Sequence, residues 1–197
     1  MAIKGYNFKT SAVKVTTPEA TTLFMCLAEV NEFTGKFGGK LIFTPEALEQ
    51  EVNYQVIGES RGKKAFKDVF NDLLEAAYLE YVQDSGKKAA KVAKIRESKD
   101  AEGNENGLFE LSCGNLEKPT IQNTDRTVEK DYSTLIANGS TMKANLYLKP
   151  YIMNGKLGIT AYLNGVLLIN VIEFGGGDVM FDDEDFTDSP VKDELEF

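Results

Sequence analysis

The chain has 197 residues, of which 42% are hydrophobic and 27% are charged, as in a globular protein with one domain and appendages. It contains no histidine and only two cysteines, which removes the commonest general base and leaves too few such ligands for a zinc site. The formal net charge of −9 is uneven: residues 178–197 hold nine acids and one lysine, whereas the rest holds 22 acids and 21 bases. A near-neutral body of this kind can still present a basic face.

Several classes of protein are not expected from this sequence. No apolar run reaches 18 residues, which argues against a membrane span, and the N-terminal residues lack the apolar stretch of a signal peptide. We therefore expect a cytoplasmic protein in which Cys26 and Cys113 are reduced, buried thiols. No phosphate-binding, dinucleotide-binding or nucleophile motif is present, so we expect neither an enzyme nor a cofactor or metal. A nuclease that uses carboxylates and a metal ion remains an alternative.

The first third of the chain predicts short strands around a loop. A short strand is expected at Ala12–Thr16 and a stronger one at Thr22–Asn31. The glycine-rich stretch 33–40 predicts a loop, after which Leu41–Phe43 resumes a strand. Pro45 then opens a short helical or turn segment, with Thr44 as its N-cap.

The clearest helix covers 65–83, where apolar residues recur at steps of three and four. Its expected packing stripe consists of Phe66, Val69, Phe70, Leu73, Leu74, Ala77 and Tyr81. The following stretch, 85–107, is rich first in lysine and then in Glu, Asn and Gly. We interpret it as a mobile excursion, with an extension of the helix as the alternative for its first residues.

The second half of the body is β-structure. Strands are expected at Gly107–Cys113, Met142–Tyr151, Lys156–Leu163 and Val166–Phe174, and the Asn-Gly pairs at 154–155 and 164–165 predict two tight hairpins. Five to six strands and one long inserted helix favour a mainly β fold of the OB-barrel type, with a β-sandwich as the competing architecture. Three glycines at 175–177 then separate a binding body, 1–177, from a disordered acidic tail, 178–197.

One strand indicates a function. Alternation along residues 142–151 sends one set to the core, Met142, Ala144, Leu146, Leu148 and Pro150. It sends the other set to the opposite face, Lys143, Asn145, Tyr147, Lys149 and Tyr151. Lysines neutralise phosphates and exposed tyrosines stack on unpaired bases of any sequence. This face therefore predicts binding of single-stranded DNA, although Lys and Tyr also decorate the wet face of ordinary antiparallel sheets.

Two further groups of residues extend this prediction. The next strand places Lys156 and Tyr162 on one side, and the hairpin at 154–155 would bring them to the same surface as Lys149 and Tyr151. The glycine-rich loop offers Lys36, Phe37 and Lys40 as a second DNA-binding candidate, with an ordinary flexible loop as the alternative.

The tail combines acids with spaced aromatic residues. Its expected partner-binding residues are Phe181, Asp182, Asp183, Glu184, Asp185, Phe186 and the terminal Phe197. A terminal Phe with its carboxylate can anchor in an apolar pocket beside a cation, while the acids steer toward basic partners. The same acids could compete with DNA for the basic face; a merely solvated tail is the alternative.

The stretch 136–178 resembles the single-stranded-DNA-binding proteins of tailed bacteriophages, in particular the helix-destabilising protein of the T-odd short-tailed phages. The matching marks are the Gly139-Ser140 turn, the Pro150-Tyr151 pair, the closing strand that runs into three glycines, and the acidic tail that ends in Phe197. Residues 20–83 match in layout only. The chain departs from the family in having no tryptophan, a shorter tail and the lysine-rich stretch 85–107.

This resemblance implies an OB-fold, a role in phage DNA replication, recombination and repair in the cytoplasm of the infected bacterial host, and annealing activity. It also implies homodimers and tail contacts to the phage DNA polymerase and primase-helicase. Tyr151 matches a stacking tyrosine of the family. A competing hypothesis from another class is an acidic DNA mimic or scaffolding protein, whose tail is the active surface and whose body binds no nucleic acid.

Overall fold

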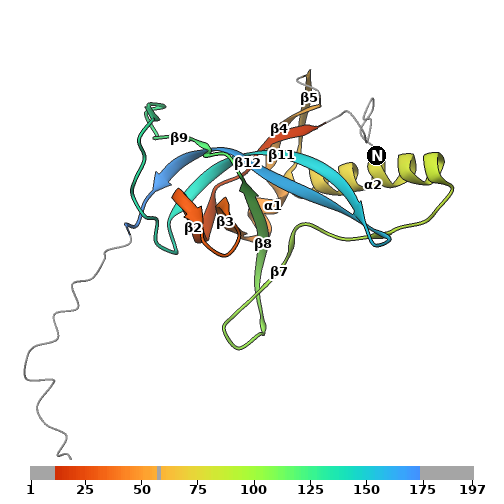
Figure 1. Cartoon of the computed structure of the whole chain (residues 1–197), viewed down its shortest axis with the longest axis horizontal. Coiled ribbons are helices and arrows are strands. Elements are labelled where there is room, and N and C mark those ends of the chain that lie inside the picture. The colour runs from red at the N-terminus through yellow and green to blue at the C-terminus, as the bar shows by residue number, and fades with distance from the viewer. Residues whose placement is uncertain (1–11, 57–58, 174–197) are drawn as a thin grey trace, which may run out of the picture.

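The computed structural model describes residues 12–56 and 59–173, which form a mainly β body with two helices (Figure 1). The helices are α1 (Pro45–Glu49) and α2 (Phe66–Ser85). The strands are β1 (Val13–Thr16), β2 (Ala20–Asn31), β3 (Lys36–Phe43), β4 (Glu51–Val56), β5 (Glu59–Ala65), β6 (Ala90–Lys91), β7 (Arg96–Lys99), β8 (Glu105–Asn115), β9 (Thr120–Gln122), β10 (Val128–Glu129), β11 (Thr141–Met153) and β12 (Lys156–Asn170).

The long β11–β12 hairpin lies in the middle of the sheet and spans the body (Figure 1). The main path of paired strands runs β10-β9-β12-β11-β2-β3-β8-β7, and β1 joins β11 to the β4–β5 hairpin. Asn154 and Gly155 turn the hairpin with φ of 51° and 71°, the left-handed conformations that a two-residue turn requires. The hairpin predicted at 154–155 is thus confirmed.

The second predicted hairpin, at Asn164-Gly165, is wrong. β12 continues through both residues, and Leu146 pairs with Leu163 while Asn145 pairs with Gly165. Asn164 is therefore the extra residue of a β-bulge, which bends the strand without ending it. The stretches predicted as two strands, 156–163 and 166–174, are joined in one strand that ends at Asn170.

The predicted closed barrel is also not found. The sheet curls until β8 meets β12, where the side-chain amide of Asn115 donates to the carbonyl of Leu163 at 3.3 Å. No ladder of backbone hydrogen bonds joins these two strands within the described residues. The number of strands exceeds the predicted five to six because β4, β5, β6, β7, β9 and β10 carry little sequence signal of their own.

The helix predicted over 65–83 is confirmed as α2, which covers the core with one apolar side. Phe66, Val69, Leu73 and Ala77 are fully or almost fully buried. The ring of Phe66 lies 5.2 Å from that of Phe43 in β3, measured between centroids. Thr44 caps α1 as expected, since its hydroxyl accepts from the backbone N–H of Ala47 at 3.3 Å.

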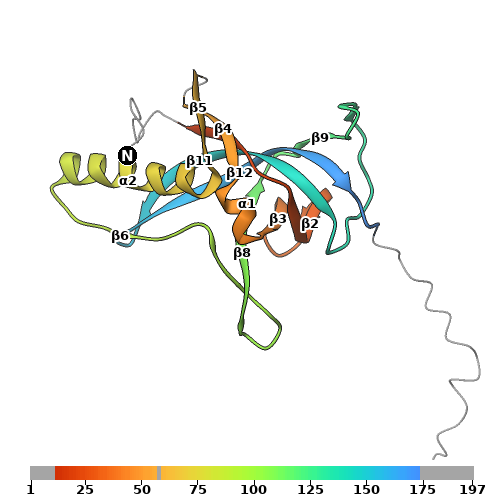
Figure 2. The ribbon, with the colours of Figure 1, turned by 180° about the vertical axis from the view of Figure 1, so that it is seen from behind.

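The segment after α2 is not the mobile excursion that its composition predicts. Gly86 ends α2 in a left-handed conformation, and the chain then turns back beside the β11–β12 hairpin (Figure 2). β6 pairs in parallel with the start of β12, and the N–H of Val92 donates to the carbonyl of Leu157 at 2.8 Å. We call residues 86–95 the strap, because they tie α2 to the edge of the sheet.

Candidate nucleic-acid interface

The structure brings the predicted lysines and tyrosines of β11 and β12 onto one surface. Tyr147 lies directly opposite Tyr162, and Lys149 lies opposite Thr160. The exposed fractions of the residues Tyr147, Tyr151 and Tyr162 are 36%, 39% and 38%. We call this surface the Lys–Tyr face; it consists of Lys143, Tyr147, Lys149, Tyr151, Lys156 and Tyr162.

The alternation that predicted this face follows from strand geometry and is confirmed from Met142 to Leu148, whereas Pro150, predicted for the core, is half-buried. Met142, Ala144, Leu146 and Leu148 on the other side of β11 are fully buried in the core. The core therefore fixes the direction in which the intervening lysines and tyrosines point. Lys156 lies at the tip of the hairpin, opposite Met153.

Lys14 of β1 adds a cation that the sequence did not single out. It pairs with Tyr147 in register, and its ammonium lies 5.6 Å from the centroid of the Tyr147 ring. This distance is within the range of a cation–π contact. The alternation of Val13, Lys14 and Val15 indicates that Lys14 points outward, but only the pairing of β1 with β11 places it on this face.

Tyr151 is held by a glycine on the neighbouring strand. Gly158 lies opposite it, and a Cβ at Gly158 would lie 2.7 Å from the Tyr151 hydroxyl and 2.8 to 2.9 Å from atoms of its ring. The ring therefore lies over the bare backbone of Gly158. This contact limits the positions that the ring can adopt while leaving part of it exposed.

A polar groove of about 370 Å³ adjoins the far end of the face. It forms around the Asn164 bulge, where the side-chain amide of Asn164 donates to Asn145 at 3.3 Å and that of Asn145 donates to Thr16 at 3.1 Å. Lys143 lines this groove and is half-buried. The groove thus combines a lysine with amides and hydroxyls, groups that can hydrogen-bond to a sugar-phosphate chain.

The second predicted cluster lies in a different setting from the expected loop. Lys36, Phe37 and Lys40 belong to β3, since the turn that precedes them is confined to 32–35. Lys40 forms an ion pair with Glu110 at 2.8 Å, whereas Lys36 is exposed and Phe37 is half-buried. The three residues line a groove of about 400 Å³ that also contains Thr160 of β12.

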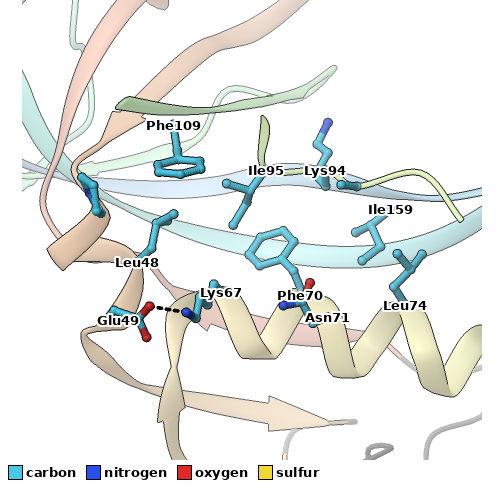
Figure 3. Close-up of a pocket in the computed structure, with 12 residues that line it drawn as sticks. Leu48, Glu49, Lys67, Phe70, Asn71, Leu74, Lys94, Ile95, Phe109 and Ile159 are labelled. Carbon is cyan, nitrogen blue, oxygen red and sulfur yellow. Dashed lines mark hydrogen bonds and ion pairs between the residues drawn. The ribbon is translucent and has the colours of Figure 1, made fainter. Parts of the chain in front are cut away.

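A further cavity, of about 340 Å³, lies between the helices and the strap (Figure 3). Phe70 of α2 faces Ile95 of the strap there, Leu74 lies next to Ile159, and the ion pair of Lys67 with Glu49 lies at the side of the cavity. Ile159, which also lines it, is on the core side of β12. The mainly apolar lining suits packing of the strap on α2 rather than contact with a polyanion.

Burial shifts the pKa of two groups that line the groove of Lys36 and Phe37. Burial raises the pKa of the Cys113 thiol to about 12, so this thiol stays protonated and unreactive. Burial also lowers the pKa of Lys94 in the strap, and Arg96 and Lys36 lower it further by repulsion. Both cysteines are free thiols, as expected, and Cys113 is buried while Cys26 is half-buried.

Within residues 12–56 and 59–173, no three residues among Cys, Asp and Glu are placed to hold a metal ion. Neither helix described there has the length and apolar character to cross a membrane. The predicted partner-binding residues of the tail lie outside the described residues.

Comparison with solved structures places this fold among single-stranded-DNA-binding proteins of bacteriophages. The crystal structure of gp2.5, a single-stranded DNA binding protein encoded by bacteriophage T7, superposes with a TM-score of 0.61 and 13% identity over 84% of this chain and 96% of that one. This chain has the same fold as the T7 protein. The resemblance predicted from residues 136–178 is thereby confirmed for the fold, which is OB-like.

The single-stranded DNA-binding protein of bacteriophage Enc34 is similar as well. Its structure matches with a TM-score of 0.54 and 15% identity over 87% of this chain and 89% of that one. A second structure of the same protein, in complex with single-stranded DNA, matches with a TM-score of 0.54 and 14% identity, over 82% and 89% of the two chains. No protein-family model and no curated protein matches the sequence.

Proposed function

We propose that the chain binds single-stranded DNA without sequence preference, through the Lys–Tyr face. The observation that carries this proposal is the pairing of Tyr147 with Tyr162 across two strands, with Lys14 and Lys149 beside them. The likeness to phage proteins of this kind supports it at the level of the fold.

The chemical groups of the Lys–Tyr face fit single-stranded DNA. Half-exposed rings can accept unpaired bases by stacking, and because every base has a π-face, stacking does not depend on sequence. The lysines neutralise phosphates and release counterions. A duplex keeps its bases stacked on one another and offers them no such contact, so the face favours single strands over duplexes. Binding of this kind requires no catalytic group.

The finer role that we propose is in phage DNA replication, recombination and repair inside the infected bacterial cell. It rests on the resemblance of 136–178 and on the composition of the tail. The acids and the terminal Phe197 of the tail would recruit the phage DNA polymerase and primase-helicase, and the body would act as a homodimer.

The test is a titration of the full chain into a fluorescent oligo-dT of about 30 nucleotides, at low and high salt, with duplex DNA as competitor. We expect tight binding that weakens steeply with salt and is little affected by the duplex. No binding at low salt, for the full chain and for a chain that ends at residue 177, would contradict the proposal. That result would favour the acidic DNA mimic or scaffolding protein.

A further inference from the structure

A groove opens where the sheet fails to close. Along the edge of β12, the strap pairs up to Leu157 and β9 pairs from Gly165 onward. Between these points the edge faces the end of β8, and the groove of about 400 Å³ that contains Phe24, Lys36 and Phe37 lies there. We call it the seam groove.

Phe24 occupies this groove in an unusual conformation. Its φ is 53° and its residue surface is 65% exposed; a bulky residue in the left-handed region is uncommon and costs free energy. The pairing of β2 with β3 is irregular here, shifting in register between Leu23 and Cys26. The apolar pattern of 22–31 does not predict this irregularity, because it is that of a regular strand.

Two contacts hold the backbone of Phe24 in place. Its N–H donates to the side-chain oxygen of Asn138 at 2.7 Å. Its carbonyl lies against Gly39 of β3, where a Cβ would approach the oxygen to 2.6 Å. The surrounding structure thus maintains a strained conformation that leaves Phe24 exposed where it lines this groove and the neighbouring hollow formed with residues 25–33 and 135–138.

The groove also holds cations that are not neutralised. Its lining includes Lys36, Lys40 and Lys94 and no carboxylate; Lys40 is paired with Glu110, but no carboxylate of the described residues forms an ion pair with Lys94. The stem of Lys94 borders the cavity beside α2, and its ammonium points away from that cavity (Figure 3). A partly desolvated ammonium without an acid partner gains from contact with a phosphate.

The seam groove is continuous with the Lys–Tyr face. Thr160 lines the groove and pairs in register with Lys149, two residue pairs away from Gly158 and Tyr151. Thr160 therefore belongs both to the edge of the Lys–Tyr face and to the groove that Phe24 and Phe37 line.

We propose that Phe24 is a further base-stacking residue, and that Lys94 and Lys36 bind the neighbouring phosphates. The path of single-stranded DNA then continues from the Lys–Tyr face into the seam groove. This inference rests on the proposed function, which it deepens by assigning residues to a second part of the binding site.

The first test compares Phe24→Gly with Phe33→Gly. Phe33 is 98% exposed in the turn between β2 and β3 and does not line the groove, so it is the matched control. We expect Phe24→Gly to weaken binding of oligo-dT of about 30 nucleotides by about 5- to 100-fold, the range for a lost stacked base. Its melting temperature should equal or exceed that of the wild type, because glycine accepts a positive φ without strain. The control should change affinity less than about twofold.

Unchanged affinity of Phe24→Gly, or an equal loss in both variants, would overturn the assignment. A crosslinking experiment on the wild-type chain does not depend on folding of a variant. Oligo-dT in which 5-iodouracil replaces some bases should crosslink to the peptide that contains Phe24 as well as to β11–β12. Crosslinks confined to β11–β12 would contradict the inference.

The lysine is tested by Lys94→Gln, with Lys91→Gln as the control, since Lys91 is paired with Glu75. We expect Lys94→Gln to reduce the slope of log affinity against log salt by about 0.7, the value for one phosphate contact on a single strand, and Lys91→Gln to leave it unchanged. Equal slopes for the wild type and Lys94→Gln would contradict the phosphate contact. Failure of the wild-type chain to bind oligo-dT at all would instead remove the proposed function.

Discussion

The three tyrosines of the Lys–Tyr face are each constrained by a different neighbour. Tyr147 has the ammonium of Lys14 near its ring, Tyr151 lies over Gly158, and Tyr162 stands opposite Tyr147. Rings that are already restricted lose less side-chain entropy when a base stacks on them. The arrangement therefore favours binding beyond the simple presence of aromatic residues.

Removing one ring measures how much that ring contributes to the affinity for DNA. We predict that Tyr151→Ala weakens binding of oligo-dT by about 1–3 kcal/mol, the usual value for one stacked base. The free energy of unfolding should change little, because the ring is partly exposed. The measurement is a fluorescence titration at fixed salt, and unchanged affinity would remove Tyr151 from the site.

The position of the ring can be tested without removing it. In Gly158→Ala the new Cβ would overlap the hydroxyl and ring of Tyr151, so the ring must move. We expect an affinity between those of the wild type and Tyr151→Ala. If Gly158→Ala binds as well as the wild type, the contact with Gly158 has no role in presenting the ring.

Among the elements, α2 has the largest structural role outside the sheet. Leu73 is fully buried beneath it, whereas Leu79 on the same helix is 52% exposed. We predict that Leu73→Ala lowers the free energy of unfolding by about 2–5 kcal/mol through the cavity that it leaves. Leu79→Ala should change it by less than about 0.5 kcal/mol. Denaturant unfolding measures both, and equal losses would show that α2 is not anchored by this side.

The elements also show what the sequence could predict and what it could not. The Lys–Tyr alternation in β11 is local, and burial of the intervening residues fixes its direction, so the sequence was sufficient. The place of Lys14 and the left-handed Phe24 depend on pairing with β11 and on contact with Gly39 and Asn138. Such contacts join residues far apart in the chain. The Asn164-Gly165 pair predicts a hairpin turn, but Asn-Gly is also compatible with the β-bulge that the structure has at this position.

At the scale of the whole molecule, charge is divided between body and tail. The body, residues 1–177, is close to neutral with 22 acids and 21 bases, whereas residues 178–197 contribute nine acids and one lysine. At short range a dense acidic segment competes with phosphates for the same cations, and salt weakens this competition.

The direction in which removal of the tail changes the affinity for DNA can therefore be predicted. We predict that a chain ending at residue 177 binds oligo-dT more tightly than the full chain at low salt, and that the difference shrinks as salt rises. The measurement is a titration of both chains over a salt series. Weaker binding after the deletion would show that the tail contributes to the site instead of opposing it.

The central claim is that tyrosines of the Lys–Tyr face stack on bases. Its most direct test compares the wild type with the double variant Tyr147→Ala, Tyr162→Ala, on oligo-dT and on an abasic strand of equal length at the same salt. We predict that the wild type prefers oligo-dT, that the double variant loses about 2 kcal/mol or more of this preference, and that both bind the abasic strand equally. A double variant that keeps the full preference for bases would contradict the account.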